Sequence, residues 1–151
     1  MQWKQAGKIF LWQLGASLLV AAAGYVAAAF FQFELPSAMA GIAMMIGAQS
    51  FAAMAEGKVP GAVVGNIWPL AWRAGLFDAV FGLVFGYMYL YYTASLVPEF
   101  AAILEQLNQS PLMGAVVVAS TILISFGTTA LGLRLGGRMG AKIFQARQRS
   151  V

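Results

Sequence analysis

Asp78 is the residue of this sequence that most directly suggests chemistry, because it is a charged group inside a long apolar stretch, five positions beyond Arg73. A charge in hydrocarbon costs several kcal/mol unless it is paired or hydrated, so such a carboxylate is a functional candidate by default. Three roles stay open: a structural ion pair or hydrogen-bonded anchor, a partner contact, and the handling of protons or ions. We favour the structural role because the sequence places no second ionisable group at that depth.

The sequence contains no His and no Cys. This absence removes the commonest general base, the usual ligands of haem and chlorophyll, thiolate metal sites and cysteine nucleophiles. A membrane enzyme would have to work through Asp or Glu with a metal ion, and the five acidic residues are scattered along the chain. We therefore expect a protein that is not an enzyme, with no metal site.

An aromatic ridge is formed by Phe77, Phe81 and Phe85, which share one face of a helix at i, i+4 and i+8. This ridge is expected to face lipid, a partner helix, or an apolar cofactor such as a quinone or carotenoid. Trp68 and Trp72 precede the same stretch and are candidates for a partner contact.

Small and hydroxyl residues recur at helical spacing. Gly82 and Gly86 form a small-xxx-small pair, and the series Gly132, Gly136 and Gly140 repeats the spacing. Such rows allow helix backbones to approach closely in a membrane. The hydroxyls near one face of the last apolar stretch are expected to bond between helices; the alternatives are a polar conduit and bonding back to carbonyls of their own helix. These residues are Thr121, Ser125, Thr128 and Thr129.

The elements that must position these residues are membrane helices, since 61% of the 151 residues are hydrophobic and only 9% are charged. A spanning helix needs about 20 mostly apolar residues. Four stretches qualify, at about residues 9–31, 36–55, 74–92 and 112–133. We expect one all-α, four-span membrane domain over residues 1–151.

The distribution of charge predicts the orientation of these spans. All nine Lys and Arg fall on one side of a four-span arrangement, which the positive-inside rule makes cytoplasmic, whereas the other two links contain only acidic residues. Both termini are therefore expected in the cytoplasm. The basic residues are Lys4, Lys8, Lys58, Arg73, Arg134, Arg138, Lys142, Arg147 and Arg149.

The links also have predictable structure. Phe100, Ile103, Leu104 and Leu107 follow the i, i+3, i+4, i+7 spacing of an amphipathic helix, expected on the outer surface between the third and fourth spans. The inner link, residues 56–73, is apolar and should lie in the interface, or else dock a partner or re-enter the membrane. The basic tail, residues 134–151, is expected to extend the last helix and to contact anionic lipids rather than nucleic acid.

Two short segments carry a family resemblance. The segment Gly47-Ala-Gln-Ser-Phe51, followed by Gly57-Lys-Val-Pro60, resembles a pattern of the ABZJ-type family of small four-helix bacterial membrane proteins. Lys58 stands where that pattern has Arg, and no acidic residue follows within Gly61–Trp72. The resemblance covers about fifteen residues, and it implies a bacterial inner-membrane location without implying an activity.

These observations favour an accessory or structural subunit of a larger inner-membrane complex, or a self-associating protein, which packs through small-residue helix faces. The alternative is a small transporter or channel component that uses Asp78. Association with a defined complex would favour the first function, and flux that depends on Asp78 would favour the second.

Overall fold

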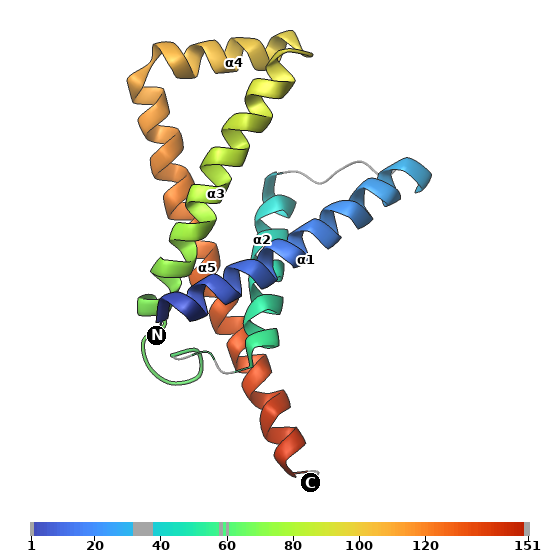
Figure 1. Ribbon diagram of the computed structural model, residues 1–151, viewed down its shortest axis with the longest axis vertical. Coiled ribbons are helices and arrows are strands. Elements are labelled where there is room, and N and C mark those ends of the chain that lie inside the picture. Colours follow the sequence, from blue (N-terminus) through green and yellow to red (C-terminus); the bar gives the residue numbers. More distant parts are fainter. Residues whose placement is uncertain (1, 32–37, 58, 60, 150–151) are drawn as a thin grey trace.

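The computed structural model describes residues 2–31, 38–57, 59 and 61–149, which form five helices (Figure 1). The expected all-α architecture is confirmed, since regular structure in the described residues is helical throughout. The helices are α1 (Gln2–Phe31), α2 (Ala38–Glu56), α3 (Trp68–Ala94), α4 (Pro98–Gln109) and α5 (Pro111–Arg149).

Three of these helices contain stretches long and apolar enough to cross a membrane: Trp3–Ala23, Trp68–Ala94 and Pro111–Ile143. The apolar part of α2, Ile42–Glu56, is shorter than such a stretch. Length and composition therefore support a membrane protein with three long candidate spans.

The helices extend beyond the apolar stretches from which they were predicted. α3 begins at Trp68, with Pro69 in its first turn, so Trp68 and Trp72 belong to the helix and not to the link before it. The backbone N–H groups in the first turn of a helix have no intrahelical partners. Proline suits this position because it has no backbone N–H group. α5 continues past residue 133 to Arg149, which confirms the expected extension of the last helix. Backbone hydrogen bonding does not stop where the side chains become charged.

The short helix between the last two long helices is present as α4. It connects the far ends of α3 and α5, so that these three helices outline a triangle (Figure 1). Proline stands at the start of α4 and again at the start of α5, where its fixed φ is compatible with the first turn.

The core lies where α1, α2, α3 and α5 cross, and it consists mostly of small side chains. Ile9 and Leu133 are its large fully buried apolar members, and they pack among alanines such as Ala52 and Ala71. Small side chains let the helix axes come close, which is the usual way that membrane helices gain packing contacts.

α2 and α5 approach each other closely through the glycine series predicted from the sequence. A Cβ atom on Gly136 would overlap the backbone carbonyl of Ser50, and one on Gly132 would overlap the side chain of Gln49. Gly140 lies against Met54 one turn further on. The segment of α5 beyond residue 133 is therefore packed on α2 over these two turns.

The described part of the inner link folds back onto the core. Val59, Ala62 and Ile67 are buried, whereas Val64 is exposed. Gly61 has a positive φ, and a Cβ at that position would overlap the carbonyl of Asn66, so the turn there requires glycine. Lys58 and Pro60, which contribute to the family resemblance, lie outside the described residues.

Candidate functional site

Asp78 lies at the centre of a buried polar cluster to which all four core helices contribute. The side-chain amide of Gln13 on α1 donates a hydrogen bond of 2.7 Å to Asp78 Oδ1, and that of Gln49 on α2 donates one of 3.2 Å to Asp78 Oδ2. The same Gln49 Nε2 donates to Thr129 Oγ1 of α5 at 2.9 Å. We call Gln13, Gln49, Asp78, Thr128 and Thr129 the polar cluster.

Each member of the polar cluster sits on the buried stripe of its own helix. Gln13 follows Ala6 and Ile9 at helical spacing on α1, and Gln49 precedes Ala52 and Ala53 on α2. All five members are buried. The local sequence thus directs each polar side chain inward, because the apolar neighbours at i±3 and i±4 turn that face toward the core.

The hydrogen bonds of Asp78 come from neutral amides. Arg73, the nearest charged residue along the helix, lies 4.5 Å over the ring of Trp72 and 5.5 Å over that of Trp3, and it donates a hydrogen bond to the carbonyl of Pro69. Of the two structural roles expected for Asp78, the ion pair and the hydrogen-bonded anchor, the geometry corresponds to the anchor.

Gln49 is the least satisfied member of the polar cluster. Its side chain is 0% exposed, and its Oε1 atom has no hydrogen-bond partner. An unsatisfied buried acceptor costs about 1–3 kcal/mol. A glutamine amide carries donors on one end and an acceptor on the other, so rotating the terminal group would present oxygen, in place of nitrogen, to Asp78 and Thr129.

The hydroxyls of α5 divide into two groups. Thr128 and Thr129 belong to the polar cluster, and Thr128 also donates to the carbonyl of Ile124 at 2.8 Å. Thr121 and Ser120 instead donate to the carbonyl of Val117 in their own helix. Among the described residues, the interhelical bonds expected for this row are therefore found at Thr128 and Thr129.

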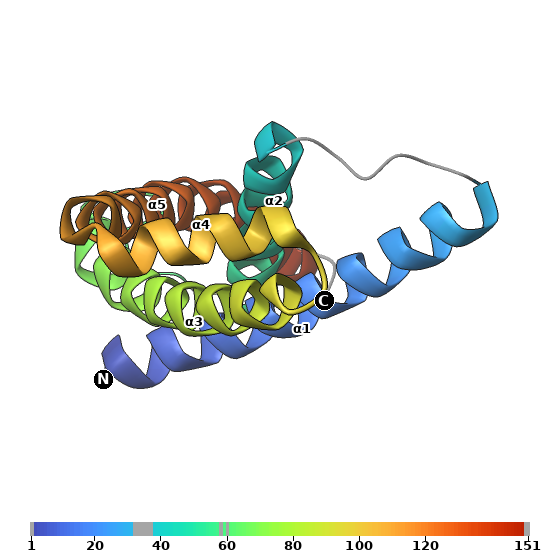
Figure 2. The same ribbon diagram turned by 90° about the horizontal axis from the view of Figure 1, so that it is seen from above.

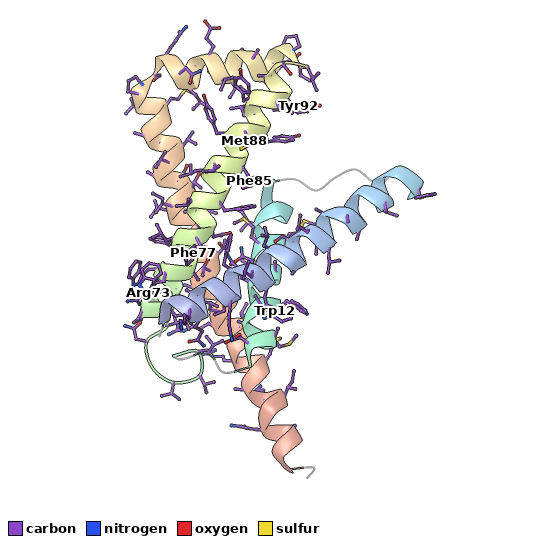
Figure 3. The ribbon with its side chains drawn as sticks, viewed as in Figure 1. Trp12, Arg73, Phe77, Phe85, Met88 and Tyr92 are labelled. Carbon is purple, nitrogen blue, oxygen red and sulfur yellow. The ribbon has the colours of Figure 1, made fainter. Side chains whose placement is uncertain are left out.

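The aromatic ridge packs in part against α1. Phe10 lies 5.8 Å from Phe77 and 5.6 Å from Phe81, measured between ring centroids, and Phe81 stacks on Phe85 at 4.2 Å. The groove beside these rings has an apolar lining, and Phe85 remains half exposed. Figure 3 shows Arg73, Phe77, Phe85, Met88 and Tyr92 following one another along α3.

The two Trp candidates for a partner contact have different surroundings. Trp72 meets Trp3 of α1 edge to face at 5.3 Å. Trp68 begins α3 with its side chain more than half exposed, and its backbone N–H donates to Asn66 Oδ1 at 3.0 Å. Trp68 is therefore the more available of the two for a contact outside the chain.

Gly82 and Gly86 lie on an open face of α3. A Cβ on Gly82 would come within 3.9 Å of Thr121, and one on Gly86 would meet nothing within 4 Å. Both line a cavity of about 340 Å³ between α3, α4 and α5. The close approach of α3 to α5 occurs instead at Gly75, where a Cβ would overlap the ring of Phe126.

Sequence reasoning selected Asp78 but did not select the two amides that bind it. The available signal was that Gln13 and Gln49 are uncharged polar residues within apolar stretches, where a buried amide needs hydrogen-bond partners. Gln49 also lies in the segment that carries the family resemblance.

Comparison with known proteins gives no match to any family model, curated protein or solved structure. The resemblance to the ABZJ-type family stays a prediction from the residues that carry it.

Proposed function

We propose that this chain is a non-enzymatic accessory or structural subunit of a larger bacterial inner-membrane complex. In this proposal all four of α1, α2, α3 and α5 cross the membrane, with both chain termini in the cytoplasm. The basic side chains near the end of α5 then meet anionic lipid headgroups at the inner surface.

The observation that carries this proposal is the position of the outer half of α1. Beyond the core, α1 leaves the other helices and projects alone (Figures 1 and 2). Leu19 is 74% exposed there, and Leu18, Val26 and Phe30 are exposed as well. Among the described residues, no other helix packs beside this part of α1, so it is well placed to contact another chain.

The residue types along that segment also support a protein contact. Gly15, Ala21, Ala22 and Ala23 are all exposed, and small residues are enriched where membrane helices meet one another. The groove along the aromatic ridge is suited to a lipid or to an apolar cofactor such as a quinone or carotenoid.

The test is photocrosslinking in the native membrane. A photoreactive amino acid replaces Leu19 on α1 or, as the matched control, Leu123 on α5, whose exposure of 72% is nearly the same. After mild detergent extraction and native separation, mass spectrometry identifies what is attached at each position.

A protein of a different sequence attached at Leu19, with only lipid at Leu123, supports the accessory subunit. A second copy of this chain attached at Leu19 supports self-association in its place. Lipid alone at both positions, with the chain migrating by itself, contradicts the proposal.

A second candidate function, a small transporter or channel component that uses Asp78, is favoured by the polar cluster. A carboxylate, two amides and two hydroxyls at the centre of the helix crossing are the groups with which membrane proteins bind ions in their interior. Reconstitution into liposomes tests this function, with ion flux expected in the wild type and lost in Asp78→Asn. Equal flux in both proteins would remove Asp78 from any transport role.

A further inference from the structure

The polar cluster has the composition of a binding site for an alkali cation. Its oxygen atoms include both carboxylate oxygens of Asp78, the hydroxyl of Thr129 and the unpartnered Oε1 of Gln49. Such hard oxygen ligands suit hard cations, whereas transition metals prefer nitrogen and sulfur. Among the described residues, no group of three or more acidic side chains gathers to hold a multivalent metal.

The charge at the site calls for a single positive charge. Asp78 receives hydrogen bonds on both of its oxygens from N–H donors, an arrangement that suits the ionised carboxylate. The guanidinium of Arg73 is engaged with Trp3, Trp72 and the carbonyl of Pro69. A monovalent cation would neutralise the carboxylate, whereas a divalent ion would leave a buried excess of positive charge.

The present spacing of the groups lies below the oxygen spacing around a bound cation, and it is nearer to that around a small cation than to that around a large one. Gln49 Nε2 lies 3.2 Å from Asp78 Oδ2 and 2.9 Å from Thr129 Oγ1, and rotation of the amide places Oε1 at that position. Na⁺ is close in size to Ca²⁺, whose ligands lie at about 2.3–2.6 Å, so neighbouring oxygens in its octahedral shell are about 3.3–3.7 Å apart. K⁺ is larger and requires wider spacing.

We infer that Asp78, Gln49 and Thr129 bind one Na⁺ ion, with the Gln49 amide rotated so that its oxygen becomes a ligand. Binding would give the Asp78 carboxylate a counter-charge, and the rotated Gln49 oxygen would contact the cation in place of the hydrogen bonds that Gln49 Nε2 donates here. Gln13, which donates to Asp78 Oδ1 at 2.7 Å, then acts as a positioning residue that holds the carboxylate in place.

The inference would name the ion for the second candidate function, but its test measures binding and needs no partner and no flux. Purified protein in detergent is melted in NaCl, KCl or choline chloride at equal ionic strength. We expect Na⁺ at about 100 times its Kd to raise the melting temperature by about 5–10 °C, and the other two cations to raise it much less.

Three variants locate the site. Asp78→Asn should abolish the Na⁺-dependent shift, and Thr129→Val should weaken the apparent affinity for Na⁺ by about tenfold or more. Thr121→Val is the matched control on the same helix, because the Thr121 hydroxyl bonds to the carbonyl of Val117 outside the polar cluster. It should keep the full shift.

A second measurement uses the wild type alone and so does not depend on how the variants fold. A hydrophobic carbodiimide adds across the O–H bond of a buried carboxyl group with no leaving group, and peptide mass mapping then reports the extent of labelling at Asp78. Na⁺ bound at the site should slow this labelling, while choline should not.

The inference is overturned if the wild type shows no shift and no protection specific to Na⁺. It is also overturned if Asp78→Asn and Thr129→Val retain the wild-type response, since Na⁺ would then bind elsewhere. An equal response to K⁺ would contradict the small-cation geometry. Binding without flux in liposomes would support the sodium site while removing the transport function.

Discussion

At the scale of single residues, the polar cluster is stabilised by hydrogen bonds between pairs of buried side chains, and not by charge alone. Asp78 is buried among apolar helices, and the 2.7 Å bond from Gln13 satisfies one of its oxygens. A buried acceptor that loses its donor carries the full cost of its own desolvation. The contribution of Gln13 to the free energy of unfolding should therefore depend on whether Asp78 is present.

A double-mutant cycle tests this dependence. Gln13→Leu should lower the free energy of unfolding by about 1–3 kcal/mol while Asp78 is present. In an Asp78→Leu background the same change should cost under about 1 kcal/mol, because no buried acceptor is left without a donor. Chemical denaturation in detergent measures both values, and equal costs in the two backgrounds would show that the pair is not coupled.

At the scale of helices, the approach of α2 to α5 depends on three glycines on one face of α5. The overlap that a Cβ would create at Gly136 is with backbone, which cannot move aside as a flexible side chain can. Two helices held this closely also fix the distance from Gln49 to Thr129. The glycine series thus positions the polar cluster as well as the helices.

Gly136→Ala should lower the free energy of unfolding by about 1–3 kcal/mol through overpacking. Gly114→Ala is the matched control on the same helix, because a Cβ there would meet nothing within 4 Å. The control should be neutral or should stabilise the protein by up to about 1 kcal/mol, since alanine is the better helix former. Thermal unfolding in one detergent compares the two variants, and equal losses would contradict the close approach.

At the scale of the whole molecule, the number of helices that cross the membrane decides where the ends of the chain lie. With α1, α2, α3 and α5 all crossing, both ends lie on one side, whereas with only the three long candidate spans crossing they lie on opposite sides. The sequence contains no cysteine, so single introduced cysteines can report each position without background.

We expect cysteines at Gln2 and Gln148 to be protected from an impermeant thiol reagent in intact cells, and one at Gln106 on α4 to be labelled. All three should react once the membrane is permeabilised, which controls for accessibility of the thiol itself. Opposite results at Gln2 and Gln148 would show that an odd number of helices crosses and would contradict the four-span proposal.

The sequence by itself determined the elements. Long apolar runs separated by proline, glycine and charge are sufficient to specify the helices, because a chain in hydrocarbon must satisfy its backbone hydrogen bonds locally. The spacing of Phe100, Ile103 and Leu107 likewise predicted α4. The sequence also predicted that the last helix continues after Leu133. The start of α3 was less predictable, since Trp68 begins the helix within the segment that the sequence assigned to the link.

Only the tertiary structure decided which side chains meet. Asp78 is recognisable in the sequence as a charge in an apolar stretch, but its partners Gln13 and Gln49 lie 65 and 29 positions away. Contacts between helices depend on their crossing points and rotations, which the periodicity within one helix does not fix. For the same reason, the isolation of the C-terminal part of α1 became visible only when the helices were placed together.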